Sequence, residues 1–260
     1  GASASGGSAT HTPSYYRTPQ EGEQPLAPMP KTYVQADRSQ LPPVGTIADL
    51  DFPEIERAQL SNGIPVVFAR RATVPVVRVS MQFDAGYSTD PEAKAGLQSL
   101  MATLLDEGTT TRNSIQLAEE EERLGAAIAT GASLDRTSVS LAALTPNLAP
   151  SVELMADIVK NPAFAPDEIE RLRAQRLAGI ASELTQPFNI ALRTLPPLLY
   201  GSNHPYGTPF TGSGTVEAVR ALTRDDFVGA HQRWIRPDNA QIFVVGDTSL
   251  AEVMPILEAN

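Results

Sequence analysis

Few residues in this chain are able to bind a metal ion or attack a substrate. Histidine occurs three times, at His11, His204 and His231, and cysteine is absent. No two of these histidines lie one helical turn apart, which is the spacing of a helical zinc-binding pair. The lack of cysteine also excludes thiolate-bound zinc, thiol catalysis and disulfide bonds. We therefore expect each histidine to be a surface or hydrogen-bonded side chain.

Other catalytic signatures are missing from the sequence. It has no Gly-x-Ser-x-Gly nucleophile elbow and no phosphate-binding loop that ends in Lys-Ser or Lys-Thr. The segment Gly212 to Thr215 could form an anion-binding nest of backbone amides. A glycine-rich turn ahead of a helix is the commoner use of such a segment, and we expect that here.

The segment from Gly96 to Thr109 carries the most information. Its apolar residues recur at helical spacing, and Gly108 follows the last of them. The segment comes after an alternating stretch that ends at Phe83, which predicts a strand with one buried face. The apolar positions of the expected helix are Leu97, Leu100, Met101, Leu104 and Leu105.

This arrangement resembles the insulinase/pitrilysin family of zinc metallopeptidases. In catalytic members the same helix carries an inverted His-x-x-Glu-His motif, whose histidine positions fall here on Ser99 and Thr103 and whose glutamate falls on Ala102. The family's third ligand, a glutamate on a later long helix, falls near Ala178 or Gly179. A catalytic zinc needs three protein ligands. The resemblance therefore implies a chain with no catalytic residue and no bound metal.

The resemblance covers the chain from about Phe52 to the end. Each matching segment is short, but their order and spacing together support the assignment. These segments are Leu60 to Gly63, Leu124 to Ala126, Asn161 to Phe164, Leu199 to Gly201, His204 to Gly207, and Asn239 to Asp247.

The apolar patterns predict an α+β fold with a mostly antiparallel sheet packed against helices. Strands and helices come in groups and do not alternate strictly, which disfavours a doubly wound parallel sheet. We expect the first three strands to be antiparallel neighbours and Pro187 to close the longest helix. Strands are expected at 54–60, 64–70, 75–83, 126–132, 136–144 and 240–245, and helices at 97–105, 114–124, 148–159, 166–184 and 224–234.

Composition divides the chain and limits its partners. Residues 1–50 are rich in Gly, Ser, Pro and Gln, which predicts a linker or extended arm. The family resemblance implies that 51–260 form one inactive peptidase-like domain. The net charge of −10, from 20 Lys and Arg against 30 Asp and Glu, argues against nucleic acid as a partner. No apolar run approaches the roughly 20 residues of a membrane span.

The family resemblance also implies a function. Its members consist of homologous halves that close around an unfolded peptide, and one half carries zinc while the other has a decayed motif. We expect this chain to be the first domain of the decayed half: inactive alone, without a cofactor, and partnered by a zinc-bearing catalytic half in the same chain or a separate subunit. The expected location is the bacterial periplasm. The alternative is a structural core subunit of a membrane respiratory assembly, which shares the fold without proteolysis.

Overall fold

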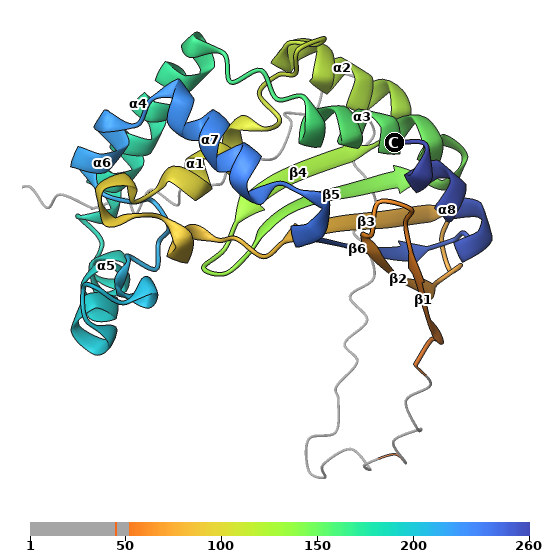
Figure 1. Ribbon diagram of the computed structural model, residues 1–260, viewed down its shortest axis with the longest axis horizontal. Coiled ribbons are helices and arrows are strands. Elements are labelled where there is room, and N and C mark those ends of the chain that lie inside the picture. The colour runs from red at the N-terminus through yellow and green to blue at the C-terminus, as the bar shows by residue number, and fades with distance from the viewer. Residues whose placement is uncertain (1–44, 46–51) are drawn as a thin grey trace, which may run out of the picture. The chain divides into compact units, whose positions relative to one another are not determined.

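The computed structural model describes Gly45 and residues 52–260. Residues 52–260 form one sheet with helices packed against it (Figure 1). Apart from Gly45, the predicted linker at 1–50 lies outside the described residues. The strands are β1 (Ile55–Gln59), β2 (Pro65–Arg70), β3 (Val76–Phe83), β4 (Ala127–Ala132), β5 (Thr137–Leu144) and β6 (Ala240–Gly246). The helices are α1 (Leu97–Leu104), α2 (Ser114–Leu124), α3 (Leu148–Lys160), α4 (Pro166–Glu183), α5 (Pro187–Tyr200), α6 (Val216–Ala221), α7 (Arg224–Trp234) and α8 (Leu250–Glu258).

The described residues form a six-stranded sheet in the order β1-β2-β6-β3-β5-β4. Only the β2–β6 pair is parallel, so the predicted α+β class with a mostly antiparallel sheet is confirmed. The expectation that the first three strands are neighbours is wrong, because β6 lies between β2 and β3. The short link after Arg70 is long enough to cross one intervening strand, since strands lie only about 4.8 Å apart.

Alternation along the central strands explains which face of the sheet is buried. In β5, Thr137, Val139, Leu141 and Ala143 are buried, and the residues between them are only half-buried. β3 and β6 follow the same period of two. Helices α1 and α3 cover this buried face. The core therefore lies between the sheet and the helices.

Helix α1 is enclosed on almost all sides. It packs against β4 and β5 of the sheet and against α4 and α7, and seven of its eight residues are buried. It begins at Gly96, which has a φ of 97° and so adopts a left-handed conformation that suits glycine. A helix that is buried in this way is an element of the core.

Side-chain caps define the ends of several helices. A capping box of Thr223 and Asp226 starts α7. A further box formed by Asn113 and Gln116 starts α2, which ends at Gly125 in a left-handed conformation. These local signals explain why the bounds of α2 and α7 follow from the sequence.

Two helices were not expected from the sequence, α5 and α8, whereas α6 is the helix expected after the glycine-rich turn. Pro187 does not simply close α4, because it is also the first residue of α5. Proline suits this position, since the first helical amide has no partner within the helix. The later Pro196 and Pro197 hid the helical pattern, because proline inside a helix removes a backbone hydrogen bond.

Candidate functional site

The candidate site lies on α1, where the family's metal ligands would stand. Ser99 is 8% exposed, Ala102 is fully buried and Thr103 is half-buried. The Thr103 hydroxyl donates to the backbone carbonyl of Ser99 at 2.9 Å. Ser99 Oγ has no hydrogen-bond partner among the described residues. One hydroxyl is thus committed to the helix backbone and the other is enclosed in the core.

The long helix α4 carries the predicted third position. Its buried side chains are Ile169, Leu172 and Ile180, whereas Ala178 and Gly179 are exposed. Neighbouring residues on a helix point about 100° apart, so Ala178 and Gly179 lie off the buried face that includes Ile180. Among the described residues, no atom outside the adjoining backbone of α4 lies within 4 Å of where a Gly179 Cβ would stand.

These side chains do not fit a zinc ion. Zinc in proteins is bound by imidazole, thiolate or carboxylate groups, and the positions on α1 and α4 offer hydroxyl, methyl and hydrogen. Elsewhere in the part of the chain that the structure describes, no three His, Cys, Asp or Glu side chains are grouped closely enough to hold a metal ion. That the chain binds no zinc stays a prediction, which metal analysis can test.

A buried ion pair lies beside the candidate site and was missed in the sequence. Arg193 Nη1 is 2.8 Å from Glu183 Oε2, with the two side chains 11% and 20% exposed. Ser213 Oγ donates to the same Glu183 oxygen at 2.8 Å, and Arg193 Nη2 donates to the Gly214 carbonyl at 2.7 Å. Glu183 therefore ties α4 to α5 and to the glycine-rich turn.

That turn lies directly against α1. Gly212 has a φ of 66°, and a Cβ placed on it would come within 3.1 Å of Ser99 Oγ and 2.8 Å of the Tyr87 ring. Thr215 caps the following helix α6 by accepting from the Ala218 amide. The expectation of a glycine-rich turn ahead of a helix is confirmed, and Ser213 contributes to the ion pair.

Carboxyl groups with raised pKa values lie at both ends of α1. Burial raises the pKa of Asp90 to about 7, although its carboxylate accepts from the amides of Gly96 at 2.9 Å and Gln98 at 3.0 Å. Burial also raises the pKa of Asp106 to about 6, with nearby Glu107 among the further causes. Desolvation thus outweighs the hydrogen bonds at the start of the helix.

The histidines do not form a cluster. His204 Nδ1 accepts from the Tyr206 amide at 3.0 Å, and its ring stacks on Tyr200. His231 Nε2 lies 2.8 Å from the Val159 carbonyl, and burial lowers its pKa. Both belong to local hydrogen-bonded structure, as expected, while His11 lies outside the described residues.

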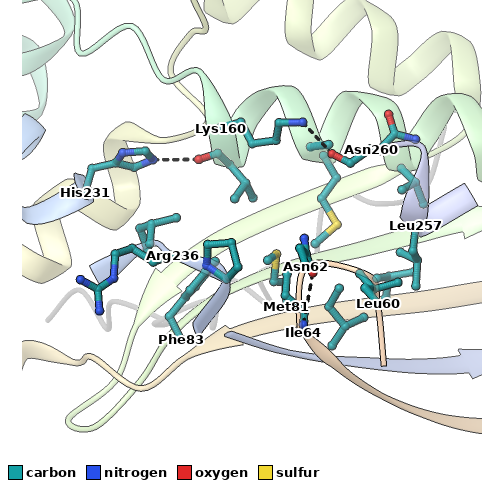
Figure 2. Close-up of a pocket in the computed structure, with 18 residues that line it drawn as sticks. Leu60, Asn62, Ile64, Met81, Phe83, Lys160, His231, Arg236, Leu257 and Asn260 are labelled. Carbon is teal, nitrogen blue, oxygen red and sulfur yellow. Dashed lines mark hydrogen bonds between the residues drawn. The ribbon is translucent and has the colours of Figure 1, made fainter. Parts of the chain in front are cut away.

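A separate cavity of about 270 Å³ lies between β3, β6, α3 and the ends of α7 and α8 (Figure 2). Two of its charged or polar lining residues form hydrogen bonds within the protein. Lys160 donates to the Asn260 backbone carbonyl at 2.6 Å, and His231 Nε2 bonds with the Val159 carbonyl. The residues that line this cavity include no acid, base and nucleophile placed to act together on a substrate. Its apolar lining includes Leu60, Ile64, Val79, Met81, Phe83, Val152, Met155, Ile242 and Leu257.

Comparison with known protein families and sequences gives consistent matches. Residues 65–198 match the family model described as insulinase (peptidase family M16), and 221–260 match the peptidase M16 inactive domain. An uncharacterized zinc protease of Mycobacterium leprae is 26% identical over 78% of this chain and 45% of its own length. Cytochrome b-c1 complex subunit 1 of Bos taurus is 30% identical over 67% of this chain and 35% of its own length. The chain thus spans less than half the length of these relatives.

Solved structures give the same fold, and the family model gives the family. The peptidase M16 inactive domain from Pseudomonas fluorescens superposes with a TM-score of 0.75 at 27% identity, over 79% of this chain and 50% of that one. The periplasmic protease PqqL from Escherichia coli has a TM-score of 0.71 at 19% identity, over 82% of this chain and 24% of that one, and shares the fold. The family match covers more than half of this chain and includes helix α1. The chain therefore belongs to the insulinase family of peptidases, family M16.

Proposed function

We propose that residues 51–260 are a non-catalytic domain of an insulinase-type zinc metallopeptidase, and that residues 1–50 are a linker or arm. In this proposal the domain forms a wall of the chamber in which an unfolded peptide is degraded. A homologous half, in the same chain or in a second subunit, holds the zinc ion. We further propose the bacterial periplasm as the location, a proposal that draws on the fold shared with PqqL.

One observation carries this proposal: α1, the helix that we propose once held the metal motif, is packed in the core. Leu100, Met101 and Leu104 are buried there, while the proposed ligand positions Ser99 and Thr103 offer only hydroxyls. A domain that keeps its fold but offers no metal ligand at these positions would act through contact with other molecules. Two further facts support it, namely the match to the inactive domain model and the relatives that are named zinc proteases.

The proposed contribution of the domain is to hold and enclose the substrate. A flexible peptide loses conformational freedom when it is oriented for attack, and an enclosed chamber also excludes competing water. These effects are worth several kcal/mol in favourable cases.

Among the described residues, no helix has the length and hydropathy needed to cross a membrane.

Reconstitution tests the proposed function. The zinc-bearing homologue from the same source is assayed on a quenched fluorescent unfolded peptide, alone and with this chain. We expect this chain to raise the rate of hydrolysis at least about tenfold, which corresponds to about 1.4 kcal/mol of barrier. A matched arm replaces this chain with an unrelated acidic protein at equal concentration. Equal rates in all arms would reject the chamber role.

The second candidate function is a structural subunit of a respiratory assembly. The observation that favours it is the 30% identity to cytochrome b-c1 complex subunit 1 of Bos taurus. Affinity purification of tagged full-length protein from its own source separates the two functions. A stoichiometric haem-containing membrane assembly in the eluate favours the structural subunit, and a zinc-bearing M16 half favours the chamber domain.

A further inference from the structure

Helix α5 exposes a large apolar surface at one end of the domain, beyond α4 and α6 and away from the sheet (Figure 1). Five large apolar side chains of α5, together with Leu184 at the C-terminal end of α4, are between 47% and 80% exposed. We call these six residues the α5 surface. They are Leu184, Phe188, Leu195, Leu198, Leu199 and Tyr200.

The direction in which the α5 surface points is fixed by the opposite side of the helix. Phe188, Leu195 and Leu199 are separated by seven and four residues, so they share one face. Arg193 points inward to Glu183 and Ser213, and Pro196 is buried. These contacts prevent the helix from rolling to bury its apolar face.

The area of the α5 surface suits a protein interface. Large side chains exposed by half to four fifths present on the order of 100 Å² each, so six present roughly 600 Å². Such an area is at the upper end of the roughly 300–600 Å² of the largest patch on a typical monomer. Two copies together would bury roughly 1,200 Å², where the range for specific interfaces begins.

The charge distribution permits contact between two copies. Arg193 is the one charged residue between Pro187 and Tyr200, and it is 11% exposed and paired. In a two-fold interface each residue approaches its own copy, so charges on the contact face would repel. The α5 surface carries none. The net charge of −10 on each copy acts only at long range, where salt screens it.

We propose that the α5 surface is the contact between two copies of this chain, packed as a two-fold dimer with Leu195 near the axis. This proposal is independent of the proposed function, because it assigns no role to a catalytic half. Apolar contact between like-charged copies has a distinctive signature. The dimer becomes tighter as salt concentration rises, whereas an association held by opposite charges becomes weaker.

Disulfide trapping tests the location of the contact. The wild-type chain contains no cysteine, so a single introduced cysteine is the only possible crosslinking site. We expect Leu195→Cys to form a disulfide-linked dimer under mild oxidation, since a disulfide requires Cα atoms within about 7 Å. The matched control is Ile115→Cys on α2, because Ile115 is 69% exposed and lies outside the α5 surface. Equal crosslinking of both variants, or none at Leu195→Cys, would overturn the proposal.

Sedimentation velocity tests the association itself. The wild-type full chain should show a monomer–dimer equilibrium that shifts toward dimer at high salt. The Leu198→Glu/Leu199→Glu double variant should weaken it at least tenfold, and Ile115→Glu should leave it unchanged. Both replaced leucines are already exposed, and circular dichroism verifies that the variant is folded. A wild-type chain that is monomeric at all concentrations, or a double variant that dimerises like wild type, would contradict the α5 contact.

Discussion

At the scale of single residues, we propose that the family's metal site is lost through side chains and not through the backbone. Ser99, Ala102 and Thr103 lie on an intact helix whose buried neighbours hold it in the core. The family pattern made these positions recognisable in the sequence. The ion pair of Glu183 and Arg193 was not, because its members are ten residues apart across two helices and meet only through tertiary packing.

Asp90 gives a prediction about pH at this scale. Its carboxyl has a pKa of about 7 in the folded chain, above that of an unfolded aspartate, because burial disfavours the charge. The folded chain therefore binds more protons between these values, and this group's contribution to stability falls as pH rises toward 7. Asp90→Asn removes the titration. We expect the free energy of unfolding of the wild type, relative to that of Asp90→Asn, to fall by about 2 kcal/mol from about pH 5 to about pH 8.

Urea unfolding at a series of pH values measures this difference. Asp238→Asn is the control, because the Asp238 side chain is 70% exposed in its pair with Arg236. The change of the difference with pH is compared between the two variants. An equal change in Asp90→Asn and in the control would show that Asp90 does not titrate with a raised pKa.

At the scale of elements, local signals in the sequence predicted helix ends and a hairpin, whereas the pairing of strands far apart in the chain was not predicted. The helices at α2 and α7 have capping residues that can be read from sequence, and the hairpin of β1 and β2 has Asn62 and Gly63 in its turn. The place of β6 between β2 and β3 depends on contacts between residues far apart in the chain. No local pattern encodes such a contact. Helix α5 escaped prediction because its internal prolines oppose a helix and its apolar residues are exposed.

Two glycines near the candidate site lead to opposite predictions. Gly179 lies exposed within α4 with open space at its Cβ position, so Gly179→Ala should stabilise the fold by about 0.5–1 kcal/mol. Gly212 has a positive φ, and a Cβ would come within 2.8 Å of the Tyr87 ring. Gly212→Ala should therefore destabilise the fold by more than about 1 kcal/mol. Chemical denaturation of both variants measures this, and a destabilising Gly179→Ala would indicate that α4 is packed differently.

At the scale of the whole molecule, the described residues share the fold of M16 structures. The sheet and helices match M16 structures over about four fifths of the chain, while the chain covers about half or less of those structures. Fold class and family followed from ordered short motifs that extend over most of the sequence. The apolar α5 surface could not be predicted, because exposure is a property of the assembled molecule.

The most direct test of the central claim is zinc content. The purified full chain is equilibrated with micromolar zinc, dialysed and measured by elemental analysis, with a catalytic M16 peptidase treated in parallel as the positive control. We predict no stoichiometric zinc in this chain, because Ser99, Ala102, Thr103 and Gly179 provide no imidazole or carboxylate ligand. One tightly held zinc ion per chain would contradict the account and show that other residues form a metal site.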